Sequence, residues 1–418
     1  MDEAAGSNPS QPAPQPNDLA ISAITSVNEI DADRWNALAN PAKKTTGPED
    51  TFDYNPFQSH AFFKALEDSG SATRETGWMG QHLVMTRGER EDPDSILGIL
   101  PCYLKTHSQG EYVFDHGWAD AFERAGGRYY PKLQATLPFT PATGRKLFTG
   151  NGPNAAKNRL MLAGGLQQVC EELEVSSAHI TFMADDEWDA LGEQGFLQRT
   201  DQQFHWLNDG YKDFDAFLTA LSSRKRKNIR KEREGALKGR DGAGGIEIEW
   251  LTGNDLTEDV WDTFFRFYMD TGSRKWGQPY LTRKFYSLIG ETMADDILLI
   301  MAKREGRYVA GAINFIGSRT LFGRHWGCVE DHPFLHFEVC YYQAIDFAIS
   351  KGLARVEAGA QGGHKLARGY MPQVTKSAHH ITHPDFRRAV DDYLERERIA
   401  VQRENEAIAR HGPFKKEG

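Results

Sequence analysis

The chain has 418 residues, of which 39% are hydrophobic and 26% are charged, and its formal net charge is −10. This length predicts two domains, and the composition is that of a globular protein with a full hydrophobic core. The acidic balance argues against a protein that wraps nucleic acid over its whole surface, but it leaves room for a local basic patch.

The cysteines and the apolar runs indicate the compartment. The four cysteines are scattered without a C-x-x-C pair, which favours reduced thiols over a disulfide framework or a zinc site. The N-terminus lacks the basic and apolar regions of a signal peptide, and no apolar run approaches the ~20 residues of a spanning helix. We therefore expect a cytoplasmic protein without a bound metal, whose membrane contact would be peripheral.

The first half of the chain is expected to alternate strands and helices behind a polar tail. Residues 1–18 contain almost nothing to bury and are predicted to be disordered. Strands are predicted at 19–27, 82–86, 96–104, 111–114 and 178–182, and helices at 31–38, 58–68, 154–174 and 185–192. Residues 115–120 are expected to form a turn, and residues 196–207 a hairpin or paired strands.

The second half is expected to repeat this order after residue 210. Helices are predicted at 214–237, 260–269, 283–293, 333–349 and 386–410, and strands at 246–251, 298–302, 309–316, 320–326 and 354–358. Both halves share the order helix, strand, turn, strand, strand. This order indicates a tandem duplication with units at 19–210 and 211–382, followed by a charged helix and tail at 383–418.

The loop that follows the buried strand 354–358 is the first candidate site. In open α/β sheets, ligands bind outside the carboxyl ends of strands. Glycines in this loop allow a close backbone approach to an anion, His364 is suited to proton transfer, and Lys365 and Arg368 are suited to phosphate or carboxylate. The alternative is a flexible connection with solvated charges. The loop residues in question are Gln361, Gly362, Gly363, His364, Lys365, Arg368 and Tyr370.

A second cluster lies upstream, and it consists of Arg324, His325, Trp326, Glu338 and Glu357. Trp326 is either a core residue or a shelf for substrate. A carboxylate in an apolar segment is costly unless it is paired, so Glu338 is either an ion-pair partner or a base with a raised pKa. Both alternatives stay open.

Two further stretches carry candidate residues. Residues 115–120, with Trp118 and Asp120, form an equivalent site in the first half, a remnant of one, or a simple turn. Between positions 224 and 233, seven of ten residues are basic, which indicates either a polyanion-binding helix or a solvated helical face. The cations proposed to contact a polyanion are Arg224, Lys225, Arg226, Lys227, Arg230 and Lys231.

Three of these stretches together resemble the FemAB-like family of N-acyltransferases, namely residues 359–370, the predicted helix around 336–345 and the Trp118-Ala119-Asp120 turn. The similarity covers about residues 57–394. That family belongs with the GNAT acyltransferases, and the Fem-type aminoacyltransferases carry two GNAT-like domains in tandem. The resemblance therefore implies an α/β fold of two GNAT-like domains with mixed sheets flanked by helices.

The resemblance also implies an activity, the transfer of an acyl or aminoacyl group to an amine, with a cell-wall precursor as a candidate acceptor. We expect His364 or Glu338 as the base, Lys365 and Arg368 at the carrier, and His325 and Gln361 in positioning. The donor is either acyl-CoA or aminoacyl-tRNA, and no cofactor is expected to be permanently bound. The Arg/Gln-x-x-Gly-x-Gly/Ala pyrophosphate loop of acetyl-CoA enzymes has no clean copy in this chain. The alternative is a non-catalytic protein that binds a cell-wall fragment or RNA.

Overall fold

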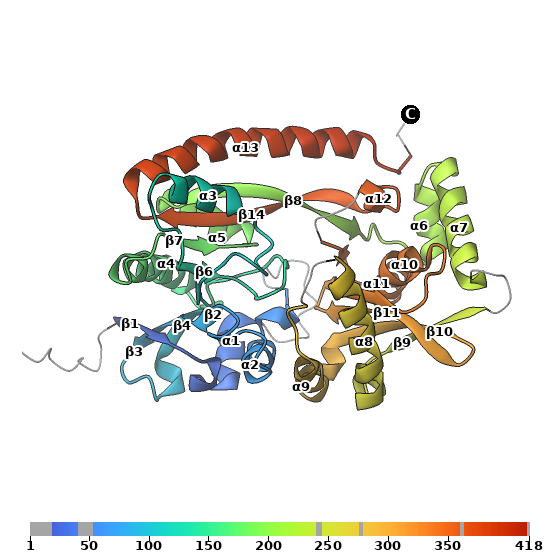
Figure 1. The fold of residues 1–418 in the computed structure, drawn as a ribbon, viewed down its shortest axis with the longest axis horizontal. Coiled ribbons are helices and arrows are strands. Elements are labelled where there is room, and N and C mark those ends of the chain that lie inside the picture. Colours follow the sequence, from blue (N-terminus) through green and yellow to red (C-terminus); the bar gives the residue numbers. More distant parts are fainter. Residues whose placement is uncertain (1–18, 41–52, 240–244, 276–278, 360–362, 416–418) are drawn as a thin grey trace, which may run out of the picture.

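The computed structural model describes residues 19–40, 53–239, 245–275, 279–359 and 363–415 (Figure 1). The tail expected at 1–18 lies outside these ranges. One mixed sheet runs through the molecule in the order β2-β5-β6-β7-β14-β8-β13-β12-β11-β10-β9, and a smaller sheet has the order β1-β3-β4. The structure thus confirms the mixed α/β fold class expected from the sequence.

The strands of the larger sheet, in chain order, are β2 (Trp78–Gly80), β5 (Tyr103–Lys105), β6 (Lys132–Ala135), β7 (Ser177–Ile180), β8 (Leu197–Leu207), β9 (Ile246–Leu251), β10 (Ile297–Arg304), β11 (Arg307–Ile316), β12 (Thr320–Cys328), β13 (Arg355–Glu357) and β14 (Met371–Ile381). Those of the smaller sheet are β1 (Leu19–Ile24), β3 (His82–Arg87) and β4 (Ile96–Leu100).

The main helices flank these sheets. They are α1 (Ala32–Ala39), α2 (His60–Asp68), α3 (His116–Arg124), α4 (Ala155–Glu172), α5 (Asp185–Glu193), α6 (Phe214–Ala220), α7 (Ser223–Lys238), α8 (Glu258–Lys275), α9 (Arg283–Met293), α10 (Leu335–Phe337), α11 (Gln343–Ser350), α12 (Gly363–Leu366) and α13 (Pro384–Arg410). A π-helical turn, Glu338–Tyr342, joins α10 to α11. None of the described helices is both long and apolar enough to span a membrane.

Strand directions on the two sides of the β14–β8 pair mirror each other. β6 and β7 are parallel, as are β12 and β13. β14 pairs antiparallel with β7, β8 pairs antiparallel with β13, and β14 and β8 are antiparallel to one another. Each half of the chain therefore contributes one long strand to the other half's side of the sheet, and the two strands cross the centre beneath α13 (Figure 1). The boundary at residue 210 stays a prediction.

Several predicted elements were wrong. The hairpin expected at 196–207 is the single strand β8, because it is paired along both of its edges. Residues 111–114 form no strand, and the turn expected at 115–120 is the start of α3. The helix expected at 214–237 is broken into α6 and α7 at Leu221, which forms a bridge with Phe414 near the chain end. β14 was not expected at all.

A hydrophobic core extends across both halves of the chain. Phe57 of the N-terminal half packs on Phe315 and Phe322 of the sheet, with ring centroids 4.6 Å and 5.4 Å apart. Phe62, on α2, lies against Phe285 of α9. Because burial of apolar area drives folding, this shared core joins the two halves into one packed body.

Candidate functional site

The parallel strands β12 and β13 of the C-terminal half diverge at their carboxyl ends. β12 and β13 are paired only at Thr320–Arg355, Leu321–Val356 and Phe322–Glu357. β13 ends there, whereas β12 continues to Cys328. Ligand sites in α/β sheets lie outside the carboxyl ends of strands, so this divergence is the natural place for one.

A β-bulge lies on β12 at this divergence. Ala312 pairs with Trp326 and Asn314 pairs with Gly323, so Arg324 and His325 together oppose a single residue of β11. Bulges re-aim side chains and are common beside active sites. Burial, helped by the neighbouring Arg324 charge, lowers the pKa of His325 to about 3, so this imidazole is neutral at physiological pH.

On one face of the sheet, aromatic side chains gather around His364. His364 lies exposed on α12, and its Nε2 is 2.9 Å from the hydroxyl of Tyr341. The ring of His336 lies 6.3 Å from His364 and 5.2 Å from Trp326, centroid to centroid. The structure thus brings together His364 and Trp326, two residues that the sequence singled out, through His336 and Tyr341, which it did not.

The two loop cations expected to hold the carrier have partners inside the protein. Lys365 is buried, and its Nζ donates to the carbonyls of Ala358 and Gly359. Burial lowers its pKa to about 8. Arg368 donates to the His364 carbonyl at 2.6 Å and to Glu232 at 2.8 Å. These cations fasten α12 to β13 and α7, and their expected contact with a carrier stays a prediction.

The other candidate residues of this loop that the structure describes differ in burial. Tyr370 is fully buried and donates its hydroxyl to the Tyr341 carbonyl at 3.3 Å, so it supports the cluster from the core. Gly363 begins α12 and is exposed. Gln361 and Gly362 lie outside the described residues.

Glu338 lies on the π-helical turn and is fully buried. Arg233 of α7 donates to both of its carboxylate oxygens, at 2.9 to 3.2 Å, and Gln343 donates at 2.8 Å. The guanidinium also binds Asp346 at 2.7 Å. Of the two alternatives open for Glu338, the geometry favours the ion-pair partner over the base.

The opposite face of the same strands is turned toward the N-terminal half. There Arg324 donates to the Phe139 carbonyl, and its guanidinium lies 5.9 Å from the ring of Tyr112. Glu357 ends β13 and is only 4% exposed. Neither of its carboxylate oxygens has a hydrogen-bond partner among the described residues. The sequence placed Arg324 and Glu357 in one candidate cluster, but it did not indicate Tyr112.

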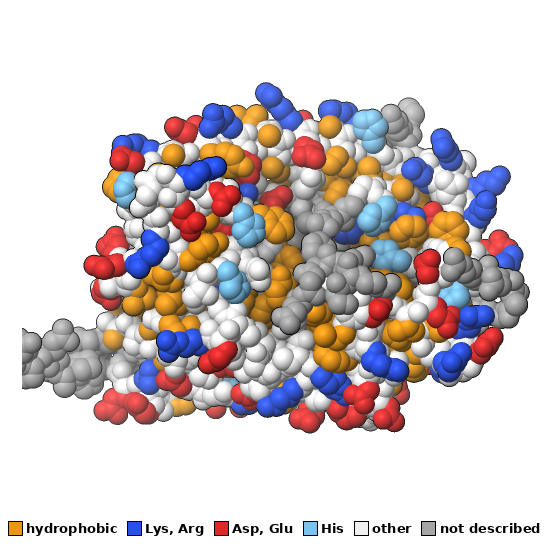
Figure 2. Space-filling model, viewed as in Figure 1, with side chains coloured by type: hydrophobic (Ala, Val, Ile, Leu, Met, Phe, Trp, Pro, Cys, Tyr) orange, Lys and Arg blue, Asp and Glu red, His pale blue; other side chains and the backbone are white. Residues whose placement is uncertain are grey.

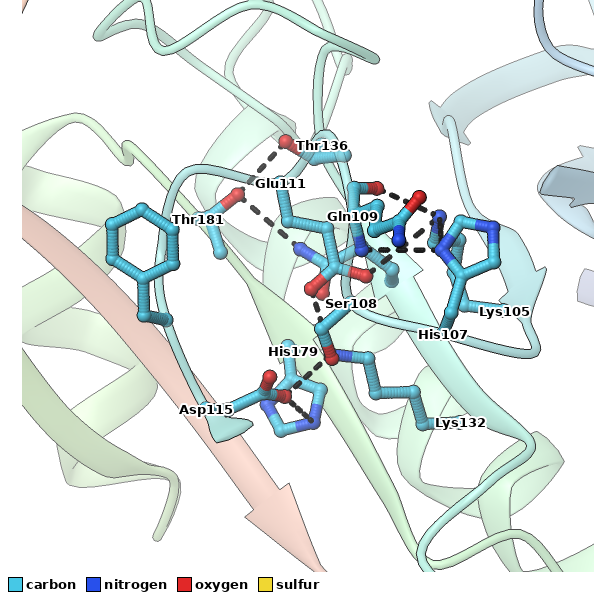
Figure 3. Close-up of polar contacts among 12 residues, drawn as sticks. Lys105, His107, Ser108, Gln109, Glu111, Asp115, Lys132, Thr136, His179 and Thr181 are labelled. Carbon is cyan, nitrogen blue, oxygen red and sulfur yellow. Dashed lines mark hydrogen bonds and ion pairs between the residues drawn. The ribbon is translucent and has the colours of Figure 1, made fainter. Parts of the chain in front are cut away.

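A buried polar network lies in the N-terminal half (Figure 3). Lys132 Nζ donates to Glu111 at 2.7 Å, to Ser108 at 2.9 Å and to Asp115. Lys105 lies 3.9 Å from Glu111. Burial lowers the pKa of Lys105 to about 6 and raises that of Glu111 to about 7. The network holds the loop that carries Tyr112 against β5 and β6. It was not predicted from the sequence.

Trp118 and Asp120, the candidates beside this network, do not converge on one site. Trp118 is buried on α3 and packs its ring 5.0 Å from that of His379. Asp120 is exposed on the other side of the same helix. A helix, rather than the expected turn, separates the two side chains because successive positions point about 100° apart.

The basic run forms the amino-terminal part of α7. Four of its cations are exposed and two are half-buried. Among these six cations, only Arg230 forms an ion pair within the described residues, with Asp215 at 2.9 Å. Lys and Arg side chains gather at the end of the molecule where α6 and α7 lie (Figure 2). The exposed cations are Arg224, Lys227, Arg230 and Lys231, and the half-buried ones are Lys225 and Arg226.

The chain was compared with known proteins and with solved structures. No curated protein matches the sequence. The solved structure of FemX is similar at 12% identity, covering 76% of this chain and 92% of that one, with a TM-score of 0.47. L-PGS from Bacillus licheniformis is similar at 8% identity over 79% and 95%, with a TM-score of 0.44. A tandem GNAT protein from the clavulanic acid biosynthesis pathway is similar at 10% identity over 88% and 99%, with a TM-score of 0.43.

The family comparison covers nearly the whole chain. A match over residues 26–416 is to the FemAB-like family, whose description is peptidoglycan biosynthesis/recognition. The resemblance expected from the sequence is thereby confirmed, and the chain belongs to the FemAB-like family.

Proposed function

We propose that the protein transfers an acyl or aminoacyl group to an amine at the divergence of β12 and β13. The observation that carries this proposal is that two parallel strands part beside a β-bulge, with titratable side chains on both faces. Acyl transfer to an amine needs a base, hydrogen-bond donors for the tetrahedral oxyanion and a grip on the carrier. The family membership supports the same reaction class.

His364 is assigned the role of base. It is exposed on α12 beside the divergence, and its Nε2 is within hydrogen-bond distance of Tyr341. Burial raises the pKa of Tyr341, so the phenol stays neutral and orients the imidazole. His364 accepts the proton that the amine loses when it attacks the carbonyl. We assign the oxyanion contact to the backbone at the β12 bulge, since the extra residue of a bulge is left out of the ladder.

Charge favours aminoacyl-tRNA over acyl-CoA as the donor. The exposed cations of α7 offer a surface for a polynucleotide backbone. Glu330 and Asp331 lie in the segment between β12 and α10. A helix start favours an anion such as pyrophosphate, and the negative charges of these two residues oppose its binding there. Glu330 accepts a hydrogen bond from Arg304 at 3.1 Å and so keeps its negative charge there. An amine of a cell-wall precursor is the acceptor that the family description supports.

The test is a direct search for product. Purified protein is incubated with charged tRNA, acetyl-CoA or longer acyl-CoAs, together with amine acceptors that include cell-wall precursors. The masses of the acceptors are then measured by mass spectrometry. We expect the acceptor to gain the mass of one aminoacyl residue from charged tRNA. Binding of an acceptor without a mass gain from any donor would instead identify a non-catalytic binding protein.

A further inference from the structure

The proposed base His364 lies on a helix that is too short to hold its own position. α12 has four residues, Gly363–Leu366. Isolated helices shorter than ~12–15 residues are marginal in water, because the first turn fixes several dihedral angles for a single hydrogen bond. The position of His364 therefore depends on side-chain contacts that anchor α12 and the turn that follows it.

Arg368 lies in the turn after α12 and anchors the backbone of His364. Its Nη1 donates to the His364 carbonyl at 2.6 Å, and the residue is only 6% exposed. The guanidinium carbon lies 3.4 Å from the centroid of the Phe337 ring, and that ring lies 5.8 Å from the imidazole of His364. A buried guanidinium is costly unless its charge is paired, so Arg368 needs an acid to stay in this place.

Glu232 of α7 is the acid that pairs with Arg368. Its carboxylate accepts a hydrogen bond from Arg368 Nη2 at 2.8 Å and another from the hydroxyl of Tyr342. Burial raises the pKa of Tyr342, so the phenol is a neutral donor. Within the described parts of the chain, Glu232 is the only acid that forms an ion pair with Arg368. Arg368 thus bridges a carboxylate of the basic helix and the carbonyl of the proposed base.

The π-helical turn Glu338–Tyr342 contacts both ends of this bridge. Tyr342 binds Glu232, and the hydroxyl of the preceding residue, Tyr341, lies 2.9 Å from His364 Nε2. Single π-helical turns inside helices are frequent at functional sites. Two consecutive tyrosines therefore support the imidazole of His364 and the acid that fixes its backbone.

The charge of Glu232 has no use in polyanion binding. It is the only acid between positions 224 and 233, where seven of ten residues are basic. Its side chain is 20% exposed, whereas the cations Arg224, Lys227 and Lys231 are exposed on the same helix. A carboxylate repels phosphates, so the contribution of Glu232 lies in its contact with Arg368 and, through Arg368, with His364.

We propose that Glu232 is a positioning residue, which fixes the backbone of His364 through Arg368 so that the imidazole stays on the hydroxyl of Tyr341. This inference rests on the proposed role of His364 as the base. Its test combines an NMR measurement, which needs no turnover, with kinetics. Failure of the positioning and failure of the proposed function therefore give different results.

The first readout is the imidazole resonance of His364 in protein that contains isotope-labelled histidine, assigned by its loss in His364→Gln. Tyr341→Phe removes the hydroxyl at Nε2 and so defines the shift of an unsupported ring. Glu232→Ala should move the resonance in the same direction, because the imidazole leaves Tyr341. A Tyr341→Phe change should then add little, as expected for two residues that act on one contact.

Two further variants show whether the carboxylate itself is responsible. Glu232→Gln keeps an oxygen that accepts from Arg368, so it should restore most of the wild-type shift. Glu234→Ala is the matched control, because Glu234 is another acid of α7, is 64% exposed and pairs with Lys238. This control should leave the His364 resonance unchanged.

Kinetics with a productive donor and acceptor give the second readout. Glu232→Ala should lower kcat about 10- to 100-fold, as for a reacting group displaced by about 1 Å, and should keep the donor KM within about 3-fold of the wild type. This split separates Glu232 from the exposed cations of α7, whose loss is expected to weaken donor binding. Glu234→Ala should keep both constants.

An unchanged His364 resonance in folded Glu232→Ala protein would overturn the inference, and so would an undiminished kcat in that variant when His364→Ala is inactive. A shifted resonance in a protein that is inactive with every donor would support the positioning and contradict the proposed function. If Glu232→Ala unfolds, as judged by circular dichroism, Arg368→Lys takes its place. Lysine keeps the charge but lacks the planar fork that reaches two acceptors, so the same shift is expected, and an unshifted resonance would overturn the inference.

Discussion

At the scale of single residues, the sequence left two roles open for Glu338, an ion-pair partner and a base, and the structure favours the ion-pair partner. Its carboxylate is buried against Arg233, so we expect Glu338→Gln to lower the free energy of unfolding by about 1–3 kcal/mol, the cost of breaking a buried charged contact. A double-mutant cycle with Arg233→Met, followed by denaturant unfolding, measures the coupling. A stable Glu338→Gln protein that has lost all turnover would return this residue to the role of base.

Lys105 gives a pH-dependent prediction. Its folded pKa is about 6, below the ordinary value of 10.5, so between these pH values the unfolded chain binds more protons than the folded one. Its burial therefore opposes folding at low pH, and stability rises with pH through this window, by up to about 1.4 kcal/mol per unit for one proton. Glu111, with its pKa raised to about 7 from 4.5, acts in the opposite direction between those two values.

The corresponding experiment compares Lys105→Met with the wild-type protein in urea unfolding from pH 6 to pH 10. The variant should be relatively more stable at pH 6 and should lose the part of the rise that Lys105 contributes. Lys212→Met is the control, because Lys212 is 83% exposed and should leave the slope unchanged. A parallel pH profile for Lys105→Met and the wild-type protein would refute the assignment.

Some candidate site residues can be found from residue patterns, whereas their long-range contacts cannot. The Gly-rich loop after a buried strand directed attention to His364, because the carboxyl end of a strand is visible in the sequence as the end of an apolar run, and the role of His364 stays a prediction. The partner of Arg368 was not visible, since Glu232 lies 136 positions away. The contacts of Arg324 were equally hidden, because they depend on a bulge and on the loop around Phe139.

At the scale of elements, α7 carries a prediction about the donor. Reversal of Arg224, Lys227 and Lys231 to Glu should weaken binding of charged tRNA and reduce the slope of log affinity against log salt by about two to three, one unit or slightly less for each lost phosphate contact. Reversal of Arg396, Arg403 and Arg410, which are exposed on α13, is the matched control. Equal loss in both triple variants would mean a nonspecific effect of net charge.

The elements also show where sequence periodicity stops being informative. The amphipathic helices and the buried strands β10 and β11 were predicted within a few residues, because their apolar spacing is strong. β14 was missed, since its sequence from Met371 to Ile381 is mostly polar and its pairing with β7 and β8 is set by distant parts of the chain. The bulge on β12 leaves no periodic signal at all.

At the scale of the whole molecule, the exchange of β8 and β14 predicts that the halves depend on each other. Residues 1–210 expressed alone lack the β14 neighbour of β7, and residues 211–418 lack the β8 neighbour of β13. We expect neither half to show cooperative thermal unfolding by circular dichroism, and the two halves together to recover it. Two independently folded halves would contradict the account of a shared core and exchanged strands.

The central claim is that the divergence of β12 and β13 performs acyl transfer with His364 as the base. The most direct measurement is single-turnover kinetics of His364→Ala with a productive donor and acceptor, alongside the donor dissociation constant. Turnover should fall by roughly two to four orders of magnitude, the usual contribution of a general base, while donor binding changes little. His116→Ala, an exposed histidine on α3, should be fully active. An undiminished rate in His364→Ala would contradict the account.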